Sequence, residues 1–145
     1  MKPAEATARR RAREAALQML YQWEVGRTSP GDSILSYWPA QEDAAALSEE
    51  HREFANALVR GTTRRLDEID SLIALRAQNW RVERMAVLDR LVLRLATYEL
   101  LAEPGTPPRV VINEALELTR QYSGDEAVGF VNGVLDGVRK QLGRE

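Results

Sequence analysis

The most apolar stretch of the chain runs from Arg81 to Ala102. Its apolar residues recur at helical spacing on one face and occupy other faces as well. They are Leu88, Leu91, Val92, Leu95 and Ala96, joined on other sides by Leu93, Leu100 and Leu101. A helix that is apolar on more than one face is packed by neighbours on several sides. We therefore expect a central helix, ended by the proline-rich segment 104–108, because proline cannot continue the helical hydrogen bonding.

The central stretch also contains four charged residues, Asp89, Arg90, Arg94 and Glu99. Each must find a gap or a rim between the neighbours that pack on the helix. The charges and the length also argue against a transmembrane helix, which needs about 20 mostly apolar residues.

Apolar residues at helical spacing predict helices along the rest of the chain. We expect one from Thr7 to about Glu24, a short one around residues 34–38, one capped by Ser48 that weakens near residues 61–63, and others over residues 66–73, 111–122 and 128–138, the last capped by Asp125. Residues 41–46 and 78–80 read as connections. Because no stretch alternates with period two, the fold class is all-α, with about seven helices in a single domain covering residues 1–145.

Glycine recurs at every fourth position of the last helix, at Gly129, Gly133 and Gly137. Each glycine costs a helix about 1 kcal/mol relative to alanine. A face of glycines allows the backbone of a second helix to approach closely. We therefore expect tight helix packing along this face.

Positive charge is concentrated at the N-terminus, although the formal net charge is only −2. Within residues 1–13, five cations (Lys2, Arg9, Arg10, Arg11 and Arg13) face one carboxylate, Glu5, which gives a local charge of +4. A surface that binds anions is therefore expected to be local, at this end of the chain.

Arg9, Arg10 and Arg13 share one side of the first helix, and Tyr21 continues that side through Leu17. An arginine cluster at a helix end is often only solvated. Cations near a helix N-terminus also oppose the macrodipole, so their placement costs stability and suggests a use. We interpret the cluster as a phosphate-binding site whose side chains lie outside the core stripe.

The sequence offers little for catalysis. It has no cysteine, which excludes disulfides, thiolate nucleophiles and cysteine-based metal sites. The single histidine, His51, follows two glutamates and is expected to face solvent, as are Asp67, Glu68 and Asp70. No phosphate-cradling or zinc-type motif is present. We expect a protein that is not an enzyme, has no cofactor and no metal, and is cytoplasmic, because no apolar signal region begins the chain.

Four stretches together resemble the NusB family of bacterial transcription antitermination factors. They are Arg-Arg-Arg-Ala-Arg-Glu at 9–14 running into residues 16–23, Asp-Arg-Leu-Val-Leu-Arg-Leu-Ala-Thr-Tyr-Glu-Leu at 89–100, Pro-Arg-Val-Val-Ile-Asn-Glu-Ala at 108–115, and Gly-Phe-Val-Asn-Gly-Val-Leu-Asp at 129–136. They occur in family order and cover most of the chain except Val25 to about His51. The last two are specific, whereas the arginine run alone is not.

The resemblance implies an all-helical bundle of two subdomains that binds the boxA element of nascent RNA. The implied partner is a small-subunit ribosomal protein that acts as NusE, and the pair helps load an antitermination complex on RNA polymerase at ribosomal RNA operons. The family's RNA contacts fall on Arg9, Arg10, Arg13, Tyr21, Glu126 and Phe130, to which the basic segment adds Lys2 and Arg11 as candidates; contacts to the ribosomal protein fall on Glu83 and Asp89.

In two places the chain departs from the family pattern. Gly129 stands where relatives carry a basic residue, which removes a phosphate contact, and Arg81 stands where a capping serine often precedes the central region. Phe130 has two interpretations: it stacks on a base, or it fills core beside Val131 and Val134.

Two other functions compete with RNA binding. The first is a helical protein-binding module whose basic N-terminus engages an acidic protein partner, without RNA. The second is the NusB-like domain of an RNA cytosine methyltransferase, which is not expected because the sequence has neither a glycine-rich cofactor fold nor a cysteine.

Overall fold

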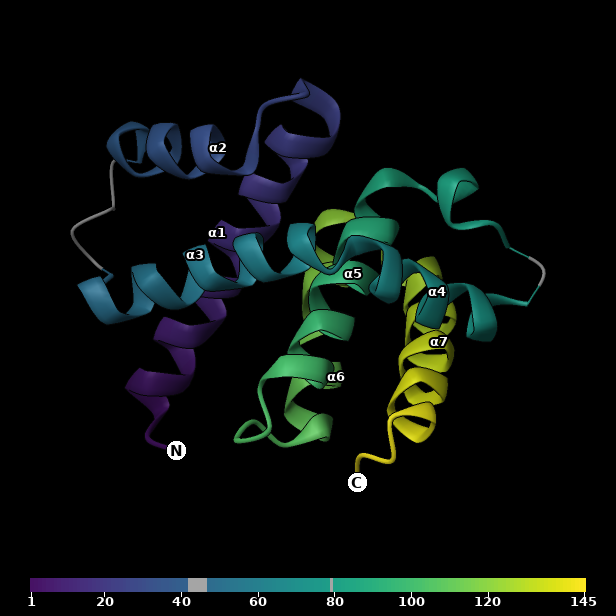
Figure 1. The fold of residues 1–145 in the computed structure, drawn as a ribbon. Helices are drawn as coiled ribbons and strands as arrows, with labels where there is room; N and C mark the ends of the chain where they lie inside the picture. Colours follow the sequence, from purple (N-terminus) through teal and green to yellow (C-terminus); the bar gives the residue numbers. More distant parts are fainter. Residues whose placement is uncertain (42–46, 79) are drawn as a thin grey trace. The chain divides into compact units, whose positions relative to one another are not determined.

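The computed structural model describes residues 1–41, 47–78 and 80–145. In these ranges the chain forms seven α-helices and no strand (Figure 1), which confirms the all-α prediction. It divides into two compact units, residues 1–63 and 64–145. The connection expected over residues 41–46 falls outside the described residues apart from Gln41, as does Asn79 in the second connection.

The first unit contains α1 (Pro3–Gly26), α2 (Pro30–Tyr37), a 3-10 turn η1 (Trp38–Ala40) and α3 (Glu49–Arg64), whose last residue lies past the boundary. Proline occupies the first turn of both α1 and α2, where its missing N–H has no helical partner to lose. Ser29 caps α2 by accepting a hydrogen bond from the Asp32 amide at 3.1 Å. Ser48 does the same for α3, accepting from the His51 amide at 3.2 Å, which confirms the expected cap.

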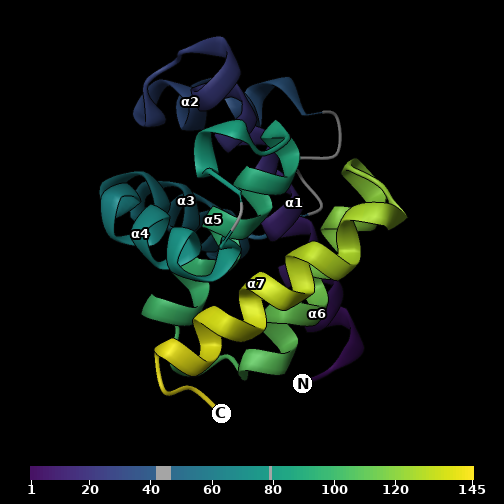
Figure 2. The same cartoon turned by 90° about the vertical axis from the view of Figure 1, so that its right-hand side faces the viewer.

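The second unit contains α4 (Leu66–Ala77), a 3-10 turn η3 (Val82–Arg84), α5 (Val87–Ala102), α6 (Pro108–Tyr122), a 3-10 turn η4 (Asp125–Ala127) and α7 (Val128–Gln141). Helix α5 packs against α4, α6 and α7, and α7 also packs against α4 and α6. Figure 2 shows α7 in front of α6, against which it packs. Ten of the sixteen residues of α5 are buried, so its apolar residues on several faces do mark a central helix.

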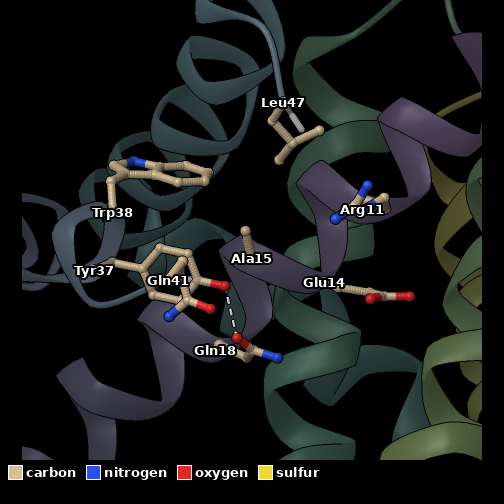
Figure 3. Close-up of a pocket in the computed structure, with 8 residues that line it drawn as sticks. All are labelled: Arg11, Glu14, Ala15, Gln18, Tyr37, Trp38, Gln41 and Leu47. Atoms are coloured by element: carbon tan, nitrogen blue, oxygen red, sulfur yellow. Dashed lines mark hydrogen bonds between the residues drawn. The ribbon is translucent and has the colours of Figure 1, made fainter. Parts of the chain in front are cut away.

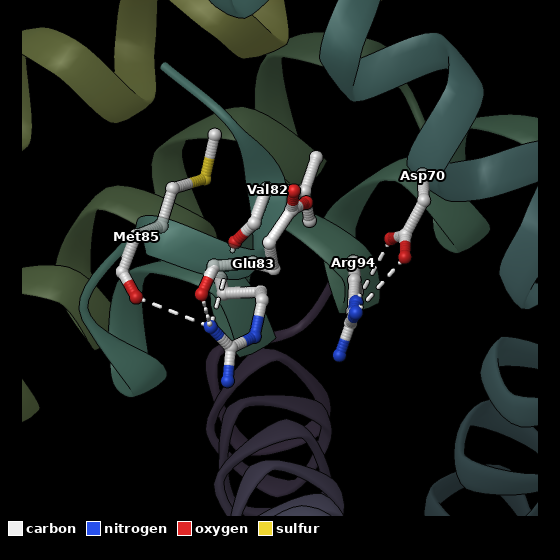
Figure 4. Close-up of polar contacts among 6 residues, drawn as sticks. Asp70, Val82, Glu83, Met85 and Arg94 are labelled. Carbon is white, nitrogen blue, oxygen red and sulfur yellow. Dashed lines mark hydrogen bonds and ion pairs between the residues drawn. The ribbon is translucent and has the colours of Figure 1, made fainter.

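The two arginines of α5 have partners on neighbouring segments. Arg90 is 8% exposed and donates to the carbonyl oxygens of Val82, Glu83 and Met85 at 3.4, 3.4 and 3.1 Å. Arg94 donates hydrogen bonds from Nε and Nη2 to the two carboxylate oxygens of Asp70 on α4, at 2.8 and 2.9 Å (Figure 4).

The paired Asp70 corrects the expectation that it belongs to a solvated face. Its side chain is only 27% exposed, and a planar, bidentate pair of this kind fixes the geometry of both partners. The clamp joins α4 to the central helix.

Several helix boundaries differ from those expected, and α1 already begins at Pro3 and not at Thr7. The central helix begins at Val87 because residues 82–84 form a 3-10 turn, and the carbonyls of Val82 and Glu83 in this turn accept from Arg90. Helix α3 continues unbroken through residues 61–63 to Arg64, with Thr62 fully buried. Asp125 does not cap α7: it opens η4, which the Ala127 amide closes on the Gly124 carbonyl at 3.3 Å, and α7 starts at Val128.

The glycine face of α7 does not serve a close backbone approach, contrary to expectation. A Cβ at Gly129 or Gly133 would meet nothing within 4 Å. A Cβ at Gly137 would meet Cδ of Arg76 at 2.8 Å, so this glycine makes room for the aliphatic stem of a side chain from α4. Two of the three glycines therefore border open space.

None of the helices in the described ranges is long and apolar enough to cross a membrane.

Candidate nucleic-acid interface

The basic segment occupies the first half of α1, and its cations differ in exposure. Lys2 precedes the first turn and is exposed, as are Arg10 and Arg11, whereas Arg9 is half-buried. Arg13 is only 4% exposed. The expectation that the arginines all lie outside the core stripe is therefore wrong for Arg13.

Phe54 of α3 is the platform on which two of these arginines rest. The guanidinium carbon of Arg9 lies 4.1 Å from the centre of the Phe54 ring, and that of Arg13 lies 5.5 Å away. Both distances fall within the range of cation–π contacts. Phe54 is half-buried and lies outside the buried positions of α3, which are Ala55, Leu58, Val59 and Thr62.

A second contact holds the first turns of α1 against α3. Nε2 of His51 lies 3.0 Å from both carboxylate oxygens of Glu5, and Nδ1 lies 2.8 Å from Oγ of Ser48. A carboxylate only accepts, so Nε2 donates to it, and Nδ1 of a neutral ring then accepts from the Ser48 hydroxyl. The His51 side chain is 15% exposed and faces another helix. The expectation that it faces solvent is therefore wrong.

Arg11 points to another side of α1 from the Arg9–Arg13 pair. It lines a cavity of about 150 Å³ together with Gln18, Tyr37 and Trp38 (Figure 3). The Tyr37 hydroxyl donates to Oε1 of Gln18 at 2.6 Å across this cavity. The five N-terminal cations therefore do not form one cluster, because a helix turns by 100° at each residue.

Tyr21 lies three turns beyond Arg10 and is 41% exposed. The two share a face, about 16 Å apart along the helix axis. The stripe expected to connect them is buried, because Leu17 is 1% exposed and Arg13 is 4% exposed. Arg10 and Tyr21 are thus two separate exposed points with core residues between them.

The second unit holds Glu126 and Phe130. Glu126 is exposed in η4, outside the α-helix in which the sequence placed it. Phe130 is half-buried, while Val131, Val134, Leu135 and Val138 form the buried face of α7. Its ring meets that of Trp80 edge to face, with centroids 5.9 Å apart. From the sequence alone, Trp80 is placed only in a connection between helices. A large aromatic residue in such a connection is itself an indication of a binding surface.

The two residues assigned to a protein partner have different environments. Glu83 is exposed and borders a cavity of about 760 Å³ that Asp67 and Asp70 also line. Asp89, in the first turn of α5, is half-buried. Its Oδ1 is shielded from solvent and has no hydrogen-bond partner among the described residues.

Hydrogen bonds shift the pKa values of groups in surface ion pairs of the second unit. Arg65, at 2.9 Å from Glu68, hydrogen-bonds that carboxyl and lowers its pKa, and the same bond raises the pKa of Arg65. Hydrogen bonds from Arg139 and then Lys140 lower the pKa of Asp136. The carboxylates are solvent-exposed, so these pairs contribute little to stability.

The described residues contain no group of three or more histidine, cysteine, aspartate or glutamate side chains that could hold a metal ion.

Comparison with known proteins gives a consistent result. The model of the NusB family matches residues 10–140. The transcription antitermination protein NusB of Koribacter versatilis is 46% identical over 137 residues, covering 94% of this chain and 92% of that protein. NusB of Myxococcus xanthus is 42% identical, covering 94% and 98%.

Solved structures agree with the sequence relatives. A crystal form of Thermotoga maritima NusB superposes with a TM-score of 0.81 at 37% identity, covering 92% of this chain and 91% of that one. A chain of the crystal structure of the antitermination factors NusB and NusE in complex with double-stranded RNA has a TM-score of 0.79 at 28% identity, covering 97% of this chain and 99% of that one. Given a family model that spans the chain and relatives above 40% identity, this protein belongs to the NusB family, whose members are non-catalytic transcription antitermination factors.

Proposed function

We propose that this protein binds the boxA element of nascent RNA as a heterodimer with a small-subunit ribosomal protein acting as NusE. The pair promotes antitermination at ribosomal RNA operons as part of the complex on RNA polymerase, in the cytoplasm where that RNA is made. The observation that carries the proposal is the basic first half of α1, whose Arg9 and Arg13 are held on the Phe54 ring. The solved relative with NusE and RNA supports the choice of partners.

The chemistry of the candidate residues suits single-stranded RNA. Lys2, Arg10 and Arg11 are exposed cations for phosphates, with Arg9 beside them, and Tyr21 and Phe130 offer ring surface on which unpaired bases stack. A carboxylate such as Glu126 repels phosphate but accepts hydrogen bonds from base amino groups. Arg13 is buried, so it contributes its positive charge and holds α1 against Phe54 of α3.

The ribosomal protein is assigned to the acidic side of the second unit. Glu83 and the neighbouring Asp67 line one cavity, which complements a basic protein. Asp89, a half-buried carboxylate in the first turn of α5, is the second residue assigned to this partner.

The test is a titration of RNA from the leader of a ribosomal RNA operon of the same genome, with a scrambled RNA of equal length as control. Fluorescence anisotropy is measured at two salt concentrations, with the isolated chain, the ribosomal protein and the pair. We expect the pair to bind the leader RNA more tightly than either protein alone, with affinity falling as salt rises. If no mixture binds RNA and the isolated chain binds an acidic protein, the result supports the alternative of a protein-binding module.

A further inference from the structure

A cavity of about 290 Å³ lies where α7 passes the end of α4. Its lining includes Arg76, Gln78, Trp80, Gly129, Phe130 and Gly133. The two aromatic rings meet edge to face, and Trp80 is 58% exposed while Phe130 is half-buried. The wall of the cavity is therefore an indole with much of its surface uncovered, supported by a second ring.

The glycines keep this cavity open. A side chain at Gly129 or Gly133 would enter space that the protein leaves empty, because a Cβ at either position meets nothing within 4 Å. The space beside Gly137, one turn further along α7, is filled by the aliphatic stem of Arg76. The helix-destabilising glycines thus coincide with the cavity beside the rings, and the cavity volume suits one planar group more than a drug-sized ligand.

The charged residues near Trp80 differ between the two cavities that it borders. Arg76 lies at its α4 side and donates to the side-chain amide of Gln141, a neutral partner that does not cancel its charge. Trp80 also borders the larger cavity, whose lining mixes three carboxylates (Asp67, Asp70 and Glu83) with Arg81. The described residues that line the smaller cavity include Arg76 and no carboxylate, so an anionic ligand is attracted on the Arg76 side of the indole.

We propose that Trp80 and Phe130 form the binding site for one unpaired nucleobase of RNA, with the adjoining phosphate near Arg76. The inference rests on the proposed RNA-binding function and adds Trp80 and Arg76 to its contacts. Exposed aromatic rings beside a cation are the means by which proteins hold single-stranded bases. Stacking of this kind is tolerant of sequence, so the site contributes affinity more than base selection.

The test compares single variants of the full chain in the RNA titration. We expect Trp80→Ala to weaken binding of single-stranded RNA roughly 5- to 150-fold, which corresponds to the 1–3 kcal/mol of one base–aromatic stack at 1.4 kcal/mol per tenfold. Trp80→Tyr keeps a ring and should retain most of the affinity. The control is Leu75→Ala, which removes an apolar side chain that is 64% exposed on α4 outside the cavity lining, and should leave affinity unchanged.

Salt dependence separates the ring from the cation. Trp80→Ala should keep the salt slope of the wild type, whereas Arg76→Ala should reduce it by about 0.7, the value for one phosphate contact on a single strand. A direct measurement uses 5-fluorotryptophan at all three tryptophans. The fluorine resonance that disappears in Trp80→Phe should shift when RNA is added and stay in place with inorganic polyphosphate.

Three outcomes would overturn the inference. If the wild type binds RNA and Trp80→Ala binds it equally well, the base site is wrong while the proposed function stands. If Trp80→Ala weakens association with the ribosomal protein but not binding of RNA by the isolated chain, the cavity is a protein contact. If the wild type binds no RNA, alone or with the ribosomal protein, the proposed function and the base site both fail.

Discussion

At the residue scale, neighbouring arginines of α1 have different physical roles. Arg10 is exposed, whereas Arg13 is 4% exposed and its guanidinium carbon lies 5.5 Å from the centre of the Phe54 ring. An exposed cation changes the electrostatics of binding with little effect on the fold, whereas a buried guanidinium also contributes packing through its stem. Single variants are therefore more informative than a joint replacement of all three arginines.

Arg10→Ala should weaken RNA binding and lower its salt slope by about 0.7, the value for one phosphate contact on a single strand. Melting temperature should hardly change. The matched control is Arg60→Ala, which removes an exposed arginine of α3 paired with Glu53 and outside the proposed site. An Arg10→Ala variant with the wild-type slope would remove Arg10 from the set of phosphate contacts.

Arg13→Ala should instead lower the free energy of unfolding by about 1–3 kcal/mol, the usual range for disturbing a buried site. Urea unfolding followed by circular dichroism measures this loss. Arg13→Lys restores the charge but not the planar group on Phe54 and should recover only part of the stability. Equal free energies of unfolding for the wild type and Arg13→Ala would show that the Arg13 side chain does not stabilise the fold.

At the scale of elements, the second unit is organised around polar contacts made by a mostly apolar helix. Arg94 ties α5 to α4 through Asp70, and Arg90 ties it to the turn at residues 82–85. At the other end, the Arg144 guanidinium donates to the carbonyls of Leu100 and Thr106, each at 2.9 Å. Arg90 and Arg144 thus satisfy carbonyls that a turn or a helix end would otherwise leave without a protein partner.

Asp70→Ala should lower the free energy of unfolding by about 1–3 kcal/mol, less than for a fully buried pair because the carboxylate keeps some solvent. The loss arises because the 8%-exposed Arg94 then lacks this partner. Glu68→Ala on the same helix removes an exposed pair with Arg65 and should cost under about 1 kcal/mol. Equal unfolding midpoints for the two variants would contradict the clamp.

Asp89→Lys should damage association with the ribosomal protein while RNA binding by the isolated chain stays nearly intact. The lysine also opposes the dipole at the start of α5, which costs about 0.3–1 kcal/mol of stability. Calorimetric titration of the ribosomal protein measures the association, and the exposed Glu83→Lys serves as a second variant with less risk to the fold. If Asp89→Lys unfolds the chain and Glu83→Lys binds normally, the proposed interface falls.

At the scale of the whole molecule, the chain forms two compact units whose boundary falls at the end of α3. Only Arg65 separates α3 from α4. The prediction of a single domain therefore becomes a prediction of cooperative unfolding.

The Trp80→Phe variant retains Trp23 and Trp38, both in the first unit. Its tryptophan fluorescence reports that unit alone, whereas circular dichroism reports all helices. We expect the two urea transitions to coincide, as they do for a two-state domain. A fluorescence transition at clearly lower urea would show that the units unfold separately.

The sequence by itself determined the helices, because apolar spacing and caps act within a few turns of chain. The multi-faced apolar pattern of residues 88–101 identified the central helix, and Ser48 marked the start of α3. The motifs around residues 108–115 and 129–136 likewise sufficed to indicate the NusB family, which the comparisons confirmed.

Only the tertiary structure decided which polar residues are exposed, since burial depends on partners distant in sequence. The Glu5–His51 contact spans 46 positions and the Arg94–Asp70 clamp 24, so neither could be read from local spacing. The same holds for Arg13 over Phe54, and for the open cavity at Gly129 and Gly133 where close helix packing was expected. Helical periodicity shows which residues share a face, but what covers that face is a property of the folded chain.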